Sequence, residues 1–582
     1  MIRESIEQAV KAALAELGAG DAPFVVSRPG DMAHGDYATN AALSAAKALK
    51  KNPREVAEML VAKLTGPSAN PLTSEAKQPG LASGPVEKIE VAGAGFINFF
   101  LSSETIKKEV ADAAQGEGYG ANESYAGKTI MVEYTDPNPF KEFHIGHLMS
   151  NAIGESIARL LERSGAKVLR ANYQGDVGPH VAKALYILLE KNIDNPSIKD
   201  ISAAYVEGAS RYEENAEDKK AIDALNKKIY EKSDERVNAL YEKGRTLTLE
   251  HFEELYKILG TKFDFYFFES AAAPIGVKIV HAHPDVFVES EGATVFKGEG
   301  YGLHTRVFLN SQGLPTYEAK ELGLMELKKE KAEFDESITI TASEQSDFFK
   351  VVYLAAKLIS PDLSDKLVHR SHGMMRFASG KMSSRLGNVV TGESLLRALT
   401  DAAKEKMKER DVADAGAVAE RVAVAAVKYA VLKQGTGKDI VFDPEKSLSL
   451  EGDSGPYLQY AHVRACSLLK KADGAEDLDS EASPLLPPAG ESKSSAPVSR
   501  QNLERLILHY PDALARAAEE LEPHHVTTYL IELASAFNSW YASERLIVDG
   551  KVSADALALV KAVKNILASG LDALGIAAPE QM

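Results

Sequence analysis

The chain has 582 residues, of which 45% are hydrophobic and 26% are charged. Because this length exceeds what one hydrophobic core supports, we expect three or more domains in a globular protein. No apolar run approaches a membrane span, and the single cysteine, Cys466, excludes an internal disulfide and a cysteine-based zinc knuckle. The net charge of −17 lowers the expectation of a nucleic-acid partner without excluding one, since binding depends on local patches.

The first part of the chain, up to residue 118, predicts an α+β domain. Residues 1–17 form an amphipathic helical pattern with acidic residues, which is not typical of a secretory or transit peptide, and the lone cysteine fits a reducing compartment. We therefore expect a cytoplasmic protein. A strand is predicted near residues 88–91, and the Pro-, Ser- and Gly-rich residues 66–85 predict a loop.

Alternating strand and helix patterns begin at about residue 119 and predict a parallel sheet covered on both faces. The first strand lies in Met131-Val-Glu-Tyr134, after which Pro137 and Pro139 prevent both further strand pairing and an early helix. A helix over residues 151–164 and a strand over 167–173 complete a βαβ unit. The loop between the first strand and the helix is therefore the natural place for a ligand.

His144-Ile-Gly-His147 stands where this helix begins. Free backbone N–H groups and the positive end of the helix dipole favour a phosphate chain there. Gly146 lets a base or ribose approach the backbone, while His144 and His147 can donate hydrogen bonds to phosphate oxygens. Alone, these four residues fit a plain surface loop equally well.

Later segments extend the same pattern. Residues 187–265 predict a helical insertion, a strand is expected at 337–341, and His372-Gly-Met-Met-Arg376 leads to a basic, hydroxyl-bearing loop, Gly380-Lys-Met-Ser-Ser-Arg385. From about residue 395 the pattern is almost wholly helical, apart from a Pro- and Ser-rich linker at 473–498. The last third therefore predicts an α-helical domain.

His144-Ile-Gly-His147 and Lys381-Met-Ser-Ser384 form a pair that is far more specific than either half, and with it the chain resembles a class I aminoacyl-tRNA synthetase. More narrowly it is similar to bacterial-type arginyl-tRNA synthetases. Residues 35–40 and 95–98 resemble that family's amino-terminal additional domain, which docks on the tRNA elbow. Residues 454–462, 510–514 and 574–582 are similar to its helical anticodon-binding domain.

The resemblance implies a multidomain fold. An α+β tRNA-binding domain is expected at 1–118, an α/β Rossmann-like catalytic domain at 119–394, and an all-α anticodon-binding domain at 395–582. The implied reaction activates L-arginine with ATP to arginyl-adenylate and transfers it to the 3′-terminal adenosine of tRNA(Arg), releasing AMP and pyrophosphate. Mg²⁺ is expected with ATP, and the protein is expected to be a monomer without bound zinc or a membrane partner.

The resemblance also assigns roles to single residues. Catalysis is expected from His144, His147, Lys381, Lys141 and Ser384, and ATP binding from His144, Gly146, His147, His372, Met374, Lys381, Met382 and Ser383. Ser384 replaces the second lysine of the usual class I loop. We hypothesise that Lys141, a lysine found in family members that lack the loop lysine, supplies the missing charge, with Arg385 as another source.

Arginine is a planar cation with five donors, which carboxylates and a flat ring recognise. The family's arginine-contacting positions correspond to Glu133, Asn138, Tyr317, Glu321 and Gln345, with Glu321 where many members have aspartate. A structural role in the sheet is the rival interpretation for Glu133 and Tyr317. Contacts with tRNA are expected from Tyr37, Asn40 and Tyr541, the last on a helix whose other aromatics predict core packing.

Three alternatives remain open at this point. The first is a lysyl- or glutaminyl-type class I synthetase, which amino-acid-dependent pyrophosphate exchange would distinguish. The second is a small-molecule nucleotidylyltransferase, which shares the histidine loop but needs no long helical C-terminal domain. The third is a tRNA-binding protein without catalysis, which the altered Lys-Met-Ser loop permits.

Overall fold

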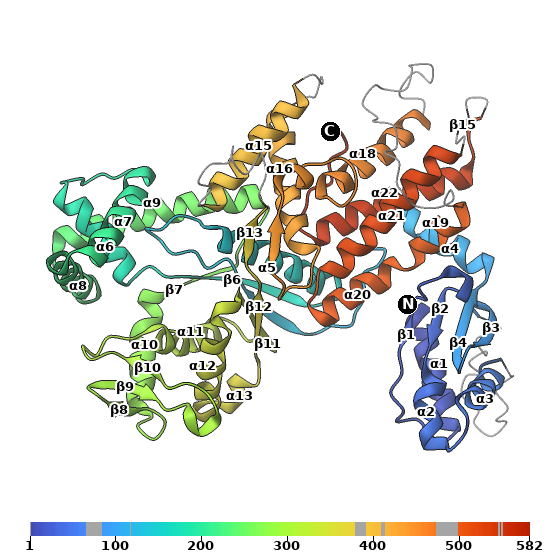
Figure 1. Cartoon of the computed structure of the whole chain (residues 1–582), viewed down its shortest axis with the longest axis horizontal. Helices are drawn as coiled ribbons and strands as arrows, with labels where there is room; N and C mark the ends of the chain where they lie inside the picture. Colours follow the sequence, from blue (N-terminus) through green and yellow to red (C-terminus); the bar gives the residue numbers. More distant parts are fainter. Residues whose placement is uncertain are drawn as a thin grey trace. The chain divides into compact units, whose positions relative to one another are not determined.

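The computed structural model describes residues 2–65, 84–116, 118–378, 391–408, 414–472, 499–544, 547–548 and 551–582 (Figure 1). Two compact units are formed. Unit 1 comprises residues 1–121, 461–516 and 529–569, and unit 2 comprises residues 122–460, 517–528 and 570–582. The C-terminal part of the chain therefore contributes to both units. Among the described helices, none has the length and apolar character needed to cross a membrane.

Unit 1 contains an antiparallel sheet with the order β1 (Val26–Ser27), β2 (Tyr37–Thr39), β4 (Phe96–Leu101) and β3 (Val86–Ala92). Helices α1 (Ile2–Glu16), α2 (Ala41–Leu49) and α3 (Pro53–Thr65) pack against this sheet around one apolar core. The remaining elements are the 3₁₀ turn Met32–His34, α4 (Ser103–Gln115), α19 (Arg500–Leu508), the hairpin β15 (Ile547–Val548) and β16 (Lys551–Val552), and much of α18 (Gly455–Ala472), α20 (Tyr510–Glu520), α21 (His524–Ser543) and α22 (Ala554–Ala573).

Unit 2 is built on a five-stranded parallel sheet, as the alternating pattern predicts. Its order is β12 (Leu367–His372), β11 (Glu336–Ala342), β5 (Thr129–Glu133), β6 (Lys167–Gln174) and β7 (Phe265–Phe268). From β5 the chain proceeds to β6 and β7 on one side, and it returns to β11 and β12 on the other. The carboxyl ends of β5 and β11 therefore flank a topological switch point, where such sheets bind ligands.

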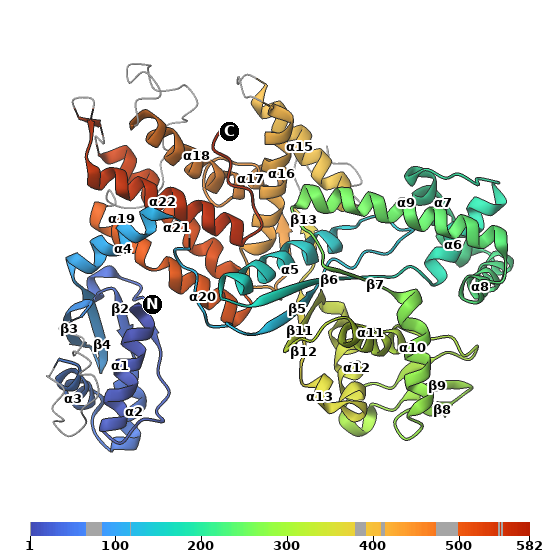
Figure 2. The same cartoon turned by 180° about the vertical axis from the view of Figure 1, so that it is seen from behind.

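Helices cover both faces of this sheet (Figure 2). Helix α5 (Ile145–Arg163) contacts β5, β6 and β11, whereas α10 (Glu269–Ala282), α11 (Tyr317–Lys331) and α12 (Ser346–Ile359) share a core with Met131 of β5. Because side chains alternate along a strand, Glu133 faces the same side as Met131 and thus faces α11. The short helix α13 (Pro361–Ser364), the 3₁₀ turns Glu299–Tyr301 and Ser343–Gln345, and the sheet of β8 (Val288–Ser290), β9 (Ala293–Phe296) and β10 (Arg306–Leu309) complete this part.

The expected helical insertion consists of α6 (Pro179–Glu190), α7 (Ile198–Glu214), α8 (Ala216–Glu231) and α9 (Glu235–Leu259), which enclose a core of their own. After the sheet come α15 (Gly392–Met407), α16 (Ala415–Leu432) and α17 (Pro444–Ser447). Between them β14 (Ile440–Phe442) pairs in parallel with β13 (Met375–Phe377). This strand lies in the stretch expected to be helical, and its three residues are too few to show a strand period.

Candidate active site

The loop after β5 has an unusual backbone. Thr135, Asp136 and Phe140 have φ values of 81°, 46° and 67°, in the left-handed region that non-glycine residues rarely adopt. Buried hydrogen bonds hold it there: the Thr135 amide donates to Ser150 Oγ at 3.0 Å, and Asn151 Nδ2 donates to Thr135 Oγ1 at 3.0 Å. Both partners belong to α5. The helix that follows the loop therefore fixes the loop's conformation.

Phe140 anchors the other end of the loop in the helical insertion. Its side chain is fully buried, and its ring stacks on that of Tyr241 in α9 with centroids 6.1 Å apart. A Cβ atom on Gly244 would lie only 2.4 Å from the Phe140 ring, so a glycine is needed there. The insertion is thus one wall of the site.

His144 caps α5, and His147 lies one turn later. Their rings stack with centroids 3.5 Å apart, and the His144 amide donates to His147 Nδ1 at 3.2 Å. Because Nδ1 is the acceptor, the proton of neutral His147 resides on Nε2. Desolvation and the Lys141 ammonium lower the pKa of His144 to about 4, and burial lowers the pKa of His147 well below its usual value. Both histidines are therefore neutral hydrogen-bond donors at pH 7.

Gly146 and the start of α15 lie against this histidine pair. A Cβ atom on Gly146 would approach the His144 ring to 3.0 Å. The Gly392 amide donates to the Phe143 carbonyl at 2.7 Å, and Thr391 forms an antiparallel bridge with His144. Lys381, Met382, Ser383, Ser384 and Arg385 lie outside the described residues. The segment that follows them in the chain nevertheless begins at the histidine loop.

His372 and Met374 precede that basic segment. His372 is buried, its Nδ1 is 2.7 Å from the Gly373 carbonyl oxygen, and burial lowers its pKa. The Met374 amide donates to Asp439 Oδ1 at 2.9 Å, and its carbonyl accepts from the Ile440 amide at 2.8 Å. Its side chain is exposed. The short β13–β14 pairing therefore fixes the backbone at this edge.

Three carboxyl groups, those of Glu133 at the end of β5, Asp136 in the following loop and Glu321 on α11, interact with one another around one ammonium. Glu133 is 2% exposed, and its Oε2 lies 2.7 Å from Nζ of Lys328, which is itself 1% exposed in its side chain. Burial and the Glu133 carboxylate raise the pKa of Glu321 to about 8, and the same two causes raise that of Asp136. When all three carboxyl groups are ionised, their negative charge therefore exceeds what the Lys328 ammonium neutralises.

Several buried polar atoms at this edge of the sheet also lack hydrogen-bond partners among the described residues. They are Glu133 Oε2, whose ion pair has no hydrogen-bond geometry, and Asn172 Oδ1, Tyr173 OH and Gln174 Oε1. All four belong to the carboxyl ends of the neighbouring strands β5 and β6, but side chains alternate along a strand, so Glu133 and Tyr173 face α11 whereas Asn172 and Gln174 face the other side of the sheet. Unpaired buried polar atoms are costly, so Glu133 Oε2 and Tyr173 OH on the face of α11 fit a cation that carries several N–H donors.

The other residues expected to bind arginine surround this cluster less closely. Asn138 Oδ1 lies so near Gly175 that a Cβ atom on that glycine would be 2.1 Å away. Tyr317, the first residue of α11, is 62% exposed, and Gln345 is exposed at the end of its 3₁₀ turn. Among the described contacts, none joins Asn138, Tyr317 or Gln345 directly to the carboxyls. The pair Glu133 and Glu321 is thus brought together, and the rest form a rim.

The sequence did not indicate four other charged residues of the site: Asp136, Glu269, Lys320 and Lys328. Lys320 Nζ lies 2.6 Å from Glu269 Oε2, and both side chains are almost fully buried. One signal was available, since Glu321 and Lys328 are seven residues apart and so share a face of α11. No sequence signal indicated the ion pair of Lys320 with Glu269, because the two residues lie on separate helices.

Comparison with known proteins identifies the chain. A family model for "tRNA synthetases class I (R), catalytic domain" matches residues 110–444, and models for the arginyl tRNA synthetase N terminal domain and the DALR anticodon binding domain match residues 2–101 and 458–582. The chain belongs to the arginyl-tRNA synthetase family. An arginine–tRNA ligase of Lactobacillus delbrueckii is 31% identical over the whole of both chains, and one of Clostridium beijerinckii is 30% identical over 94% of each.

Solved structures agree with this family. Arginyl-tRNA synthetase of Thermus thermophilus matches with a TM-score of 0.76 and 27% identity over the whole of both chains. That of Plasmodium falciparum, at 21% identity and a TM-score of 0.77 over 100% of this chain and 99% of its own, shows the fold. The protein is therefore an ATP-dependent ligase that joins arginine to tRNA, and ATP, L-arginine and tRNA are its substrates. The expected family, fold class and activity are confirmed.

Within this synthetase, Lys141 lies beside the histidine loop. Its ammonium is 5.4 Å from the ring centroid of Tyr205 in α7, and burial lowers its pKa. The same ammonium contributes to the lowered pKa of His144 and His147. Tyr205 carried no sequence signal, since aromatic residues on a helix most often pack in a core.

Two residues expected to contact tRNA, Tyr37 and Asn40, form hydrogen bonds within unit 1. Tyr37 is 1% exposed and donates through its hydroxyl to Asp512 Oδ2 at 2.8 Å, while Asn40 Oδ1 accepts from the Val25 amide at 2.9 Å. The side chain of Tyr37 is thus packed inside unit 1, and its contact with tRNA stays a prediction.

Tyr541 lies on α21, and its side chain is partly exposed. Its ring centroid is 5.5 Å from the Arg464 guanidinium. The neighbouring aromatics Phe537 and Trp540 are buried, as helical packing predicts. A partly exposed ring beside a cation suits stacking on a base.

Arginine binding is expected to depend on pH through Glu321. A guanidinium favours the ionised carboxylate, so arginine that contacts Glu321 is expected to release a proton on binding below a pKa of about 8. Affinity should rise by up to about tenfold per pH unit below that pKa and level off above it. Titration calorimetry between pH 6.5 and 9, in two buffers of different ionisation enthalpy, measures both effects. Glu321→Gln should remove the proton release, and an unchanged release in this variant would assign it to another group.

Proposed function

We propose that the carboxyl cluster beyond β5 is the arginine side-chain site of the synthetase. The observation that supports it most is the group of Glu133, Glu321 and the half-buried Asp136, with which Lys328 alone among the cations of the described residues forms an ion pair. A guanidinium supplies one positive charge and five donors to such a group. Asn138, Tyr317 and Gln345 then contact the rest of the amino acid from the rim.

The histidine loop binds ATP in this proposal. His147 donates from Nε2 and His144 from its own ring, which orients phosphate oxygens without adding charge. Gly146 admits the ribose and base, and His372, Met374, Lys381, Met382 and Ser383 complete the ATP site. The charge of the triphosphate is met by Mg²⁺ that enters with ATP and by the lysines.

The chemistry requires no covalent enzyme intermediate. The arginine carboxylate attacks the α-phosphorus of ATP, the bond to the β-phosphate oxygen breaks, and pyrophosphate leaves. A terminal ribose hydroxyl of the tRNA, the 2′-hydroxyl by the class I resemblance, then attacks the arginyl carbonyl and releases AMP. The residues of the site act by holding the two reactants in line and by stabilising charge on the departing phosphates.

In this scheme Lys141 shares pyrophosphate stabilisation with Lys381, because Ser384 stands where a second loop lysine is usual. Lys141→Ala should slow single-turnover adenylate formation by about 10²-fold, the loss typical for one electrostatic contact to a transition state. Rapid-quench measurement of pyrophosphate release at saturating ATP and arginine, with cognate tRNA present, tests this. Lys183→Ala is a matched control, since the Lys183 ammonium also lies over a tyrosine ring, that of Tyr212 at 4.1 Å. An unchanged rate for Lys141→Ala would contradict the role.

One experiment tests the proposed reaction as a whole. ATP–pyrophosphate exchange is measured with each amino acid, with and without cognate tRNA(Arg). Exchange with arginine alone among the amino acids is expected, and the family resemblance implies that it requires tRNA. Exchange with lysine or glutamine would overturn the assignment of the carboxyl cluster to arginine, and exchange without tRNA would count against the expected tRNA requirement.

The proposal divides the work among three segments. Residues 1–118 bind tRNA, with Asn40 among the contacts, and residues 119–394 carry out both steps. Residues 395–582 bind the anticodon, with Tyr541 as a stacking residue. The protein is proposed to act as a monomer in the cytoplasm, where protein synthesis consumes arginyl-tRNA. Light scattering of the free protein and of its tRNA complex tests the monomer.

A further inference from the structure

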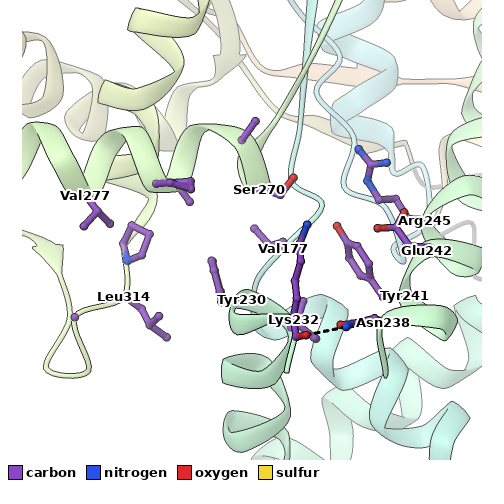
Figure 3. A pocket seen from close by; sticks show the side chains of 16 residues that line it. Val177, Tyr230, Lys232, Asn238, Tyr241, Glu242, Arg245, Ser270, Val277 and Leu314 are labelled. Atoms are coloured by element: carbon purple, nitrogen blue, oxygen red, sulfur yellow. Dashed lines mark hydrogen bonds between the residues drawn. The ribbon is translucent and has the colours of Figure 1, made fainter. Parts of the chain in front are cut away.

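Helix α9 of the insertion is anchored to the loop that follows β6. The carboxylate of Asp176 in that loop is fully buried, and it accepts hydrogen bonds from Arg245 Nε at 2.9 Å and from Tyr241 OH at 3.2 Å. Tyr241 and Arg245 line one pocket together with Ser270 of α10 (Figure 3). Because buried hydrogen bonds to a charged group are strong, this part of α9 is a fixed support for the residues that follow it.

Two consecutive residues further along α9, His251 and Phe252, contact different parts of unit 2. Phe252 is buried, and its ring centroid lies 6.1 Å from that of Phe143, the residue before His144. His251 Nε2 lies 2.9 Å from Glu393 Oε2 in the first turn of α15. One turn of α9 therefore contacts both the start of the histidine loop and α15.

The first residues of α15 hold the backbone of the histidine loop in turn. A Cβ atom on Gly392 would lie 3.2 Å from the Phe143 carbonyl oxygen and 3.3 Å from that of His144. This close approach accompanies the hydrogen bond from the Gly392 amide to the Phe143 carbonyl and the bridge between Thr391 and His144. The histidine loop, α9 and α15 thus contact one another pairwise, and an ion pair joins the two helices.

Charged side chains surround this ion pair at a cavity of about 250 Å³ between α9, α15 and α16. Besides His251 and Glu393, the charged residues that line it are Glu254, Arg397, Asp401, Lys404 and Glu420. Arg397 also donates to Glu393 Oε1 at 2.8 Å, from within α15. The hydrogen bond with Glu393 raises the pKa of His251 above its usual value, and the same bond lowers the pKa of Glu393. His251 is therefore more than half protonated at pH 6.5, its usual pKa.

Protonation of His251 sets the strength of the ion pair in the neutral pH range. Because the pKa of His251 is raised in the folded protein, the pair contributes its full stability below pH 6.5 and loses it as the pH rises through the raised pKa. A neutral imidazole remains above that pH. Its hydrogen bond to the Glu393 carboxylate then lacks the attraction between two opposite charges.

We propose that His251 and Glu393 are positioning residues for ATP binding, which hold the start of α15 against the backbone of His144. The inference rests on the proposed role of the histidine loop in binding ATP. Neither residue touches a substrate in this arrangement. The ring of His144 follows its backbone, and a displaced donor loses affinity for the phosphate oxygens. Weakening the pair is therefore expected to raise the KM for ATP, while the arginine site on β5 and α11 keeps its KM.

The test measures the KM for ATP by pyrophosphate exchange at saturating arginine and cognate tRNA, between pH 6 and pH 9. His251→Gln keeps a hydrogen-bond donor but cannot become charged. At pH 6 its KM should exceed that of the unaltered enzyme about threefold, the size expected for a partly exposed ion pair, and at pH 9 the two values should agree. His251→Lys, which stays charged, should have a lower KM than the unaltered enzyme at pH 9. A ratio between His251→Gln and the unaltered enzyme that does not change with pH would overturn the proposal.

Arg397→Gln is the matched control, because it removes the other cationic partner of Glu393 and leaves the contact between α9 and α15 in place. Its KM for ATP, relative to that of the unaltered enzyme, should not vary with pH. Glu393→Gln removes the same ion pair from the other side and should match His251→Gln at pH 6. Equal increases in the KM for ATP and the KM for arginine would indicate a general loss of folding and would also contradict the positioning role.

His144→Asn tests the role of the histidine loop separately. If this variant raises the KM for ATP and His251→Gln does not, the positioning role of the ion pair is wrong and the ATP site stands. If His144→Asn leaves the KM for ATP unchanged, the histidine loop does not bind ATP, and the proposed function is wrong at this point.

Discussion

Glu133→Gln is expected to raise the KM for arginine by at least about 100-fold and to leave the KM for ATP nearly unchanged. The substitution removes a charged acceptor for the guanidinium, and hydrogen bonds to charged groups are the strong ones in recognition. It also leaves the ammonium of Lys328 buried without its partner. Breaking a buried pair in this way should lower the free energy of unfolding by about 3 kcal/mol.

The double variant Glu133→Gln/Lys328→Met separates these two losses. Replacing both partners removes the unpaired charge, so most of the thermal stability should return while the KM for arginine stays high. Thermal unfolding and steady-state exchange kinetics on the single and double variants measure this. Recovery of the arginine KM in the double variant would mean that Glu133 serves only as the partner of Lys328.

Gly323→Ala is expected to destabilise unit 2 by about 3 kcal/mol, at the upper end for an overpacked contact. Helices α10 and α11 approach so closely that a Cβ atom on Gly323 would lie 2.1 Å from the Ala272 carbonyl oxygen and 2.8 Å from the Gly276 amide nitrogen. Both obstacles are backbone atoms of a packed helix, so α11 must move. Because α11 carries Tyr317 and Glu321, the KM for arginine should rise roughly tenfold, as misplaced binding groups lose affinity.

Gly300→Ala is the control for this prediction, since nothing lies within 4 Å of the added Cβ position there. It should leave both the melting temperature and the arginine KM unchanged. If Gly323→Ala lowered the melting temperature without affecting the arginine KM, the displacement of α11 would not reach the site. Differential scanning calorimetry and exchange kinetics on the same preparations distinguish these outcomes.

The parts of the site that depend on local sequence were predictable. Two prolines and a helix start placed the loop and the histidine pair correctly, because Pro137 and Pro139 restrict the backbone whatever surrounds them. The parallel sheet followed from alternation of strands and helices. The family resemblance then brought together residues that lie on separate strands and helices.

What escaped prediction depends on contacts between distant segments. The left-handed conformations of Thr135 and Phe140 have no sequence signal, since residues of these types normally avoid that region, and Asp136, whose type adopts it more often, gives only a weak one. The partner of Glu133 is Lys328, almost 200 residues away, and Asp136 looked like an ordinary turn residue before a proline. The charge state of the site is therefore a property of the tertiary structure rather than of any motif.

The contact between Phe140 and Gly244 sets a condition on how this enzyme can be altered. Residues with rare backbone angles persist where surrounding structure determines them, and here that surrounding includes a helix from the insertion. Shortening or exchanging the insertion would free the loop to relax, even though no insertion residue takes part in the proposed bond-making steps. A chimera that accepts a foreign insertion would therefore need a matched loop, and the two segments are best exchanged as one cassette.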